Sequence, residues 1–149
     1  MAGQELKGAA VSETKELIRS SVDRWNARDH DGWCALFAST SFEFEGPGGV
    51  RATGPEAVEA VWSLWNDAFP DNRIGLVGAH GEPGIATHQG LFEGTHTGPL
   101  VGPGGTVQPT GKSVSIPFVM IYQSDEEKVT GLRLYFDQLE LLGQLGITG

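Results

Sequence analysis

Cysteine, long apolar runs and basic side chains are all scarce in this sequence. Cys34 is the only cysteine among 149 residues, so no intrachain disulfide can form. No stretch approaches the roughly 18 apolar residues of a membrane-spanning helix, and the first residues contain no apolar run typical of a signal peptide. The net charge of −9 argues against nucleic acid or an anionic membrane as a partner, because both bind clustered Lys and Arg. We therefore expect a soluble, cytoplasmic protein.

The length and composition predict one folded domain. The 149 residues are enough for a single hydrophobic core, and 39% hydrophobic with 19% charged residues is ordinary for a globular protein. No internal repeat, linker or low-complexity segment interrupts the chain. We expect residues 1–11 to be a flexible tail and residues 12–149 to form the domain.

Three segments in the first half have the spacing of amphipathic helices. The first begins after Ser12 as N-cap and ends in the polar stretch 26–32. A shorter helix follows around Trp33, and the third begins with a capping box from Thr53 to Glu56. The apolar faces carry Val11, Thr14, Ile18, Val22 and Trp25 in the first helix, Trp33, Leu36 and Phe37 in the second, and Val58, Val61, Trp62, Trp65 and Phe69 in the third.

The remaining segments read as strands. Helices followed by an antiparallel meander predict an α+β domain, with the helices on one face of a curved sheet. The Gly/Pro-rich stretch 98–111 is expected to be an irregular loop, and long loops of this kind often border a binding site. The strands are expected at residues 42–45, 73–80, 84–96, 112–123 and 128–137.

Asp137 ends the last apolar strand and is followed by a leucine-rich segment. A carboxylate between two apolar segments is expected to be partly desolvated, which would raise its pKa. We therefore interpret Asp137 as a general acid/base at the floor of an apolar pocket. The alternative is an N-cap for a turn at 138–145. Arg133 and Tyr135 share the strand parity of Asp137, and Arg133 would lower the pKa of Asp137 if it were close.

Histidine supplies the second candidate for chemistry. His96 lies at the end of the longest predicted strand, where it could bind a substrate oxygen or shuttle a proton, or could be a structural histidine bonded to loop backbone. His88 has the same parity but is roughly 26 Å away along an extended strand, so the two cannot share a metal. No His, Cys and carboxylate set with metal-ligand spacing is evident, and we expect no metal site. Cys34 is interpreted as a small buried hydrophobic residue.

Five short runs occur together in an order typical of one family. They are Trp25-Asn26, Ala68-Phe69-Pro70-Asp71, Gly94-Thr95-His96-Thr97-Gly98, Pro109-Thr110-Gly111-Lys112 and Tyr135-Phe136-Asp137-Gln138. Together they resemble the SnoaL-like polyketide cyclases of the nuclear transport factor 2-like superfamily. The resemblance implies a cone-shaped α+β barrel, in which a strongly curved antiparallel sheet packs on three N-terminal helices, usually as a dimer or tetramer.

The resemblance also implies a reaction, an intramolecular aldol condensation without a cofactor, of lyase or isomerase class. Asp137 then matches the acid/base of the family, and His96 would assist at the substrate oxygen. We expect a small apolar carbonyl-bearing molecule as the partner, with no cofactor, nucleic acid or membrane, in a homodimer or homotetramer. The expected substrate-binding residues are Trp25, Trp33, Trp62, Trp65, Phe69, Phe92, Phe118, Tyr122, Arg133 and Tyr135.

Two other functions on the same fold stay open at this point. One is a non-catalytic small-molecule-binding or structural domain, which an exposed, helix-capping Asp137 would favour. The other is an epoxide hydrolase or ketosteroid-type isomerase. A hydrolase of this kind needs a second carboxylate beside Arg133, for which Glu43, Glu45 and Glu93 are candidates.

Overall fold

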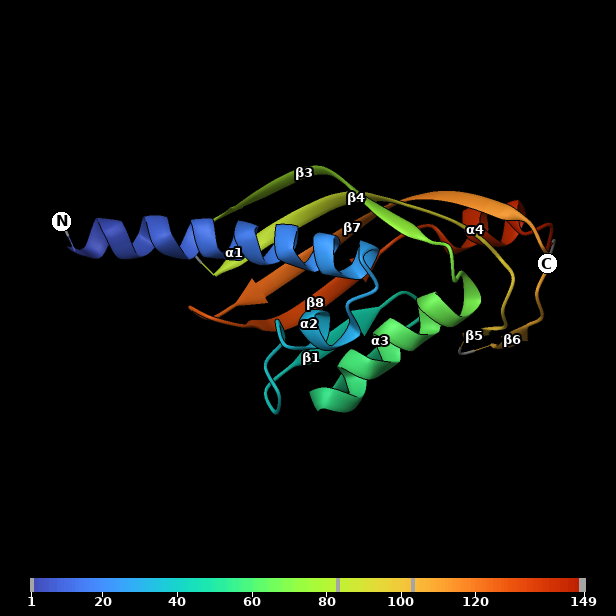
Figure 1. Ribbon diagram of the computed structural model, residues 1–149, viewed down its shortest axis with the longest axis horizontal. Coiled ribbons are helices and arrows are strands. Elements are labelled where there is room, and N and C mark those ends of the chain that lie inside the picture. The colour runs from blue at the N-terminus through green and yellow to red at the C-terminus, as the bar shows by residue number, and fades with distance from the viewer. Residues whose placement is uncertain (1, 83, 103, 148–149) are drawn as a thin grey trace.

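Six strands form one curved sheet with helices packed on it, in a computed structural model that describes residues 2–82, 84–102 and 104–147 (Figure 1). In the first helix, side chains are described from Thr14 onward. None of the described helices is long and apolar enough to span a membrane. The helices are α1 (Ala2–Asn26), α2 (His30–Cys34), α3 (Gly54–Ala68) and α4 (Gln138–Gln144). The strands are β1 (Glu43–Gly46), β2 (Val50–Thr53), β3 (Arg73–Glu82), β4 (Ile85–Thr95), β5 (Leu100–Gly102), β6 (Gly105–Val107), β7 (Ser113–Ser124) and β8 (Val129–Tyr135).

The strand order of the main sheet is β2-β1-β8-β7-β4-β3. Neighbouring strands run antiparallel except β1 and β8, which pair in parallel with Phe44 opposite Leu132. The expected fold class, a curved and largely antiparallel sheet packed with helices, is confirmed. The expected simple meander is wrong in one respect, because β1 from the first third of the chain pairs beside the last strand. Such a pairing between distant segments leaves no local pattern in the sequence.

Helix α1 lies along one face of the sheet, and α3 lies below it beside β1 (Figure 1). The predicted periodicity is confirmed in α1, where Ile18, Val22 and Trp25 are buried against β3, β4 and β7. Helix α3 packs on β1, β2 and β5, and α4 packs on β7 at the far end of the sheet. The core therefore lies between the helices and the concave side of the sheet.

The helix boundaries differ from those predicted. Helix α1 begins at Ala2, so residues 2–11 are helical. A flexible tail was expected there. The segment is rich in good helix formers such as Ala, Glu and Lys, which explains the difference. Helix α2 begins at His30, inside the stretch predicted to break the helix, because the Asp29 side chain accepts a hydrogen bond from Gly32 N. Thr53 is the N-cap of α3 as predicted, but its side chain makes no capping hydrogen bond.

Regular structure also occurs where none was expected. The Gly/Pro-rich stretch contains the β5–β6 hairpin, in which Leu100 pairs with Val107. The sequence likewise did not predict strand β2 or helix α4. Short elements of this kind have too few residues for a periodic pattern, and their neighbours in space stabilise them instead.

A buried polar network joins α1, α3 and the segment between α3 and β3. Trp25 Nε1 donates to Asn72 Oδ1 at 2.6 Å. Asn72 Nδ2 in turn donates to Asn66 Oδ1 at 2.9 Å and to the carbonyl of Phe69 at 2.8 Å. Asn72 has no solvent exposure, so these bonds replace the water that its amide loses on folding.

Candidate functional site

A small cavity lies between α1 and the concave face of the sheet. Its volume is about 60 Å³, and most of its lining is aromatic and aliphatic. Ser21, His88 and Tyr122 bring polar groups to it. None of the described lining residues is Asp, Glu, Lys or Arg, so a ligand here would meet apolar surface and a few hydrogen-bonding atoms.

A larger open cleft of about 730 Å³ adjoins this cavity. Helix α3, strands β1 and β2, the β5–β6 hairpin and helix α4 form its walls. Val101 and Leu139, which are 58% and 80% exposed, contribute apolar surface to it, and none of its described lining residues is charged. The cleft and the cavity share Phe44, Val61, Trp65, Leu134, Phe136 and Leu141 as a common wall.

Ser21 is the acceptor for two buried hydrogen bonds beside the cavity. Trp33 Nε1 and the Tyr122 hydroxyl both lie 3.0 Å from Ser21 Oγ and donate to it. Burial raises the pKa of Tyr122 to about 12, so the phenol stays neutral. Ser21 was not predicted as a site residue, although it lies on the same helix face as Ile18 and Trp25, and that spacing could have identified it.

His88 provides the cavity with an acceptor that has no partner. Its Nε2 lies 3.2 Å from the carbonyl of Gly75, which requires the proton on Nε2. Burial lowers the pKa of His88, and the Gly75 carbonyl opposes this only in part, so the ring is neutral. Nδ1 is therefore an acceptor, and it makes no hydrogen bond within the described part of the chain. In the sequence, the alternation of Ala86, His88 and Phe92 was the available signal for this inward position.

Asp137 lies at the rim of the cleft and not inside it. Its side chain is exposed, and its Oδ1 accepts hydrogen bonds from Leu139 N at 3.0 Å and Glu140 N at 3.1 Å as the N-cap of α4. The expected desolvation is therefore wrong. The predicted shared parity with Arg133 and Tyr135 holds, but these three residues face outward, because Leu132 and Leu134 occupy the inner face of β8.

Arg133 does not form the hydrolase arrangement. Its Nε lies 3.8 Å from Glu45 Oε2, and both side chains are about half exposed on the outer face of the sheet. A pair with this exposure contributes little to stability. Neither residue lines the cleft or the cavity. Arg133 and Glu45 therefore do not enclose the water that a hydrolase of this kind needs.

His96 is fully buried but lines neither space. Its Nδ1 accepts from Thr110 N at 3.2 Å and lies 3.0 Å from Thr110 Oγ1. Burial lowers the pKa of His96, while the backbone at Gly98 and Val107 opposes the shift. This corresponds to the alternative interpretation, a histidine that holds the loop after β4 to the segment before β7.

The structure brings six of the predicted binding residues to the cavity, namely Trp25, Trp33, Trp65, Phe92, Phe118 and Tyr122. The others lie elsewhere. Trp62 packs on Trp25 and Trp33 behind the cavity, and Phe69 packs between Phe92 and His96. Tyr135 is 52% exposed on the outer face.

Comparison with known proteins agrees with this architecture. A profile of the SnoaL-like polyketide cyclase family matches residues 15–145. This protein belongs to the SnoaL-like polyketide cyclase family. The predicted resemblance is thereby confirmed, and membership of the family indicates a small-molecule ligand. A search of curated proteins finds no match for this SnoaL-like chain.

Solved structures with this fold include several proteins related to polyketide metabolism by name. A protein of Jannaschia sp. CCS1 assigned as a SnoaL-like polyketide cyclase is 20% identical over 93% of this chain and 94% of its own, with a TM-score of 0.80. AclR of Streptomyces galilaeus, assigned as a hydroxylase, is 24% identical over 91% of this chain and 82% of its own, with a TM-score of 0.76. IdmH of Streptomyces antibioticus, assigned as a polyketide cyclase, is 19% identical over 91% of this chain and 99% of its own, with a TM-score of 0.73. At these identities the likeness concerns the fold.

Proposed function

We propose that this SnoaL-like protein binds a small, largely apolar molecule that carries both a carbonyl and an enolic or phenolic hydroxyl group. The observation that carries the proposal is the combination of an uncharged apolar cleft with His88 Nδ1, a buried acceptor that lacks a partner. A buried polar atom without a hydrogen bond is costly. A ligand that satisfies this atom therefore gains affinity that a purely apolar ligand does not.

The sizes of the two spaces determine how the ligand lies. Since one water needs roughly 10 to 15 Å³ of cavity volume and a cavity that holds benzene has about 150 Å³, the inner cavity of about 60 Å³ has room for a small polar group but not for a ring. The cleft of about 730 Å³ falls in the usual range for ligand sites, which is roughly 300 to 1,000 Å³. We place the ring system in the cleft and its hydroxyl toward the cavity. Side chains of the shared wall, Trp65 and Phe136 among them, must turn to let the hydroxyl through.

The protonation state of His88 selects the polar group of the ligand. Neutral His88 offers Nδ1 as an acceptor, and the Tyr122 hydroxyl already donates to Ser21. The cavity therefore favours a ligand that donates, such as a phenol or the enol of a dicarbonyl compound. A carbonyl oxygen cannot satisfy His88 Nδ1, because both atoms are acceptors.

Two naphthalene ketones test this proposal. The protein is expected to bind 6-acetyl-2-naphthol about ten-fold more tightly than 2-acetonaphthone, which lacks the hydroxyl, because one buried hydrogen bond contributes about 1.4 kcal/mol. Isothermal titration calorimetry measures both. His88→Phe is expected to abolish the difference, and His88→Gln, whose amide oxygen can still accept, to keep part of it. Circular dichroism checks that each variant is folded.

A charged substitution in the cleft separates the two parts of the site. Val101→Asp is expected to weaken both ketones equally, since Val101 lines the cleft and not the cavity. Equal affinity of the wild type for the two ketones would contradict the role of His88. Failure of the wild type to bind either ketone would contradict the proposed function itself.

Ring closure is a second candidate function, favoured by the family, whereas the exposed, helix-capping Asp137 favours binding without chemistry. Phe136 and Gln138, on either side of it, both line the cleft. In this reaction the Asp137 carboxylate would take a proton from a carbon beside a carbonyl, and the resulting enolate carbon would bond to a second carbonyl carbon of the same molecule. The alkoxide formed would then receive the proton from Asp137. His96 is too enclosed to take part without movement of the loop that covers it.

Deuterium uptake at the acetyl methyl group of 6-acetyl-2-naphthol tests the first step of this reaction. If Asp137 is the base, the wild type is expected to accelerate uptake above the buffer rate, and Asp137→Asn to slow it by about a hundred-fold. Asparagine is as good an N-cap as aspartate, so this variant removes the charge and keeps α4. Uptake that Asp137→Asn leaves unchanged and His88→Phe abolishes would assign the proton transfer to His88. No acceleration by the wild type would leave binding as the function.

A further inference from the structure

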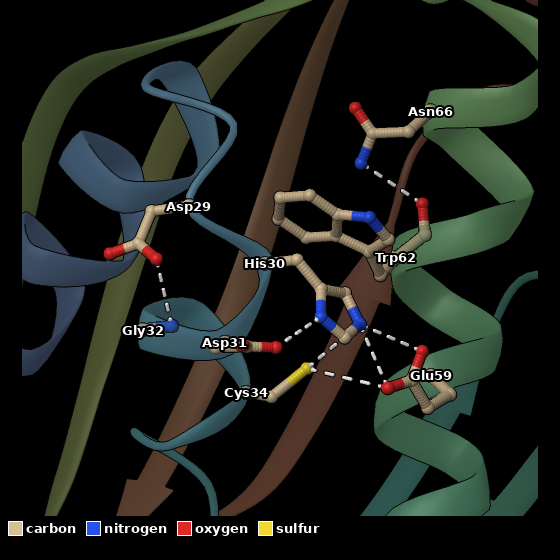
Figure 2. A network of polar contacts seen from close by, with 8 residues as sticks. All are labelled: Asp29, His30, Asp31, Gly32, Cys34, Glu59, Trp62 and Asn66. Carbon is tan, nitrogen blue, oxygen red and sulfur yellow. Dashed lines mark hydrogen bonds and ion pairs between the residues drawn. The ribbon is translucent and has the colours of Figure 1, made fainter.

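His30, Cys34 and Glu59 form a cluster of donor atoms on the surface, away from the cleft (Figure 2). His30 and Cys34 are the first and last residues of α2, and Glu59 projects from α3 beside them. Residues four apart in a helix lie on the same face, which places the imidazole over the thiol. The expectation that no His, Cys and carboxylate set exists is therefore wrong, because Glu59 comes from a distant part of the sequence.

The distances between the three donors suit one tetrahedral ion. His30 Nε2 lies 3.5 Å from Cys34 Sγ and 2.8 Å from Glu59 Oε1, and Cys34 Sγ lies 3.9 Å from Glu59 Oε1. Ligands on one tetrahedral zinc ion are separated by roughly 3.3 to 3.6 Å, given metal–ligand distances of about 2.0 to 2.3 Å. Small adjustments of the exposed Glu59 side chain would bring all three donors to such an ion.

His30 is also oriented in the way that metal-binding histidines are. Its Nδ1 lies 2.9 Å from Asp31 Oδ1, a carboxylate partner of the kind that metal-binding histidines commonly have. Its Nε2 contacts the Glu59 carboxylate, so a bound ion would replace the proton on Nε2. The Trp62 ring contacts the imidazole edge to face, with centroids 5.2 Å apart. Figure 2 shows His30 between Trp62, Asp31 and Glu59, with one ring nitrogen directed to Asp31, the other to Glu59, and the Cys34 thiol beside them.

We propose that His30, Cys34 and Glu59 bind a divalent transition-metal ion, with Zn²⁺ as the fitting metal. The nitrogen, sulfur and carboxylate donors favour zinc over Mg²⁺ or Ca²⁺, which prefer oxygen ligands. Three protein ligands leave one coordination position for water or a small ligand. The three ligands line a surface groove to which Ser39, Thr40, Ser41 and Lys128 also contribute.

The ordinary alternative is a surface ion pair between His30 and its acidic neighbours. The half-exposed His30 and Glu59 side chains are consistent with such a pair. The ion pair does not involve sulfur, whereas the metal requires the Cys34 thiolate. The thiol therefore distinguishes the two interpretations.

Titration of the untagged, full-length protein with Co²⁺ provides the test. One equivalent is expected to produce a thiolate-to-cobalt charge-transfer band and the visible bands of four-coordinate cobalt, and Zn²⁺ is expected to displace it. Cys34→Ser should remove the charge-transfer band and weaken Zn²⁺ binding by about a hundred-fold. Asp31→Ala, which removes only the partner of the imidazole, should weaken it by about ten-fold.

Glu56→Gln is the matched control for Glu59→Gln. Both glutamates are exposed on α3 and lose the same charge, but Glu56 is not in the cluster. Glu59→Gln is expected to weaken Zn²⁺ binding and Glu56→Gln to leave it unchanged, with circular dichroism confirming that each is folded. Absence of stoichiometric cobalt binding to the wild type, or binding that Cys34→Ser does not alter, would overturn the proposal.

Discussion

Replacing Asn72 by leucine is expected to lower the free energy of unfolding by about 3 kcal/mol. The Asn72 amide, which has no solvent exposure, accepts from Trp25 Nε1 and donates to Asn66 and to the carbonyl of Phe69. Leucine has a similar size but leaves Trp25 Nε1 without an acceptor in the core and removes both bonds of the Asn72 amide N–H group, and a buried donor without a hydrogen bond costs about 1 to 3 kcal/mol. The Phe69 carbonyl still accepts from the backbone N–H of residue 72. For a domain of this size, this corresponds to a fall in Tm of roughly 6 to 12 °C.

Asn66→Leu is the control for this prediction. It introduces the same side chain on the same network but removes only the bonds made by Asn66, at a residue that is half-buried. Its expected cost is about 1 kcal/mol. Urea unfolding of the two variants, followed by tryptophan fluorescence and circular dichroism, measures the difference. An Asn72→Leu variant as stable as Asn66→Leu would show that the network does not anchor α1 to the segment before β3.

Replacing Ser21 by alanine is expected to cost about 2 to 3 kcal/mol, although the change removes only one atom. The reason is that Trp33 Nε1 and the Tyr122 hydroxyl both donate to Ser21 Oγ and would both lose their acceptor. An unpaired buried donor costs more than the hydrogen bond itself contributes. Ser20→Ala, at the neighbouring position of α1, is expected to change stability by less than about 0.5 kcal/mol.

A double-mutant cycle with Tyr122→Phe tests whether the stability cost of Ser21→Ala comes from the lost hydrogen bond to the Tyr122 hydroxyl. Tyr122→Phe alone should cost about 1 kcal/mol, because it removes one donor and leaves Ser21 bonded to Trp33. In the Ser21→Ala background the same change should cost little, since the hydroxyl is then already unpaired. The coupling measured by urea unfolding is expected to be about 1 kcal/mol. Additive effects would mean that the Tyr122 hydroxyl and Ser21 do not interact.

Ser21 and His88 have different roles in the proposed recognition of a ligand. Tyr122 and Trp33 are held by Ser21, so neither is free to bond a ligand. His88 Nδ1 is then the polar atom of the cavity that a ligand can satisfy. In the proposed function, the Ser21 hydrogen bonds would keep the cavity in shape, and His88 would provide selectivity for the ligand.

Periodic patterns were enough to predict much of the framework. The helical spacing of Ile18, Val22 and Trp25 identified the buried face of α1, and strands β3, β4, β7 and β8 lie close to the residues predicted for them. The five short runs identified the SnoaL-like family, and the family profile confirms it. Local patterns of this kind depend on neighbours within one element, which a sequence contains in full.

These patterns did not predict which side of each strand faces the core. Alternation correctly grouped Arg133, Tyr135 and Asp137, but it could not say whether they or Leu132 and Leu134 face the core. The tertiary structure decided this, because the leucines are the residues that bury apolar area against α3 and α4. Asp137 consequently lies outside, where the unpaired N–H groups of α4 provide it with hydrogen bonds.

The sequence by itself determined the fold class, the family and the absence of any intrachain disulfide. Only the tertiary structure decided which side chains meet. The parallel pairing of β1 with β8, the unpaired His88 in the cavity, and the contact of Glu59 with His30 and Cys34 all join segments that are distant in sequence or depend on what surrounds them. Such contacts follow from long-range packing, which leaves no periodic trace in the chain.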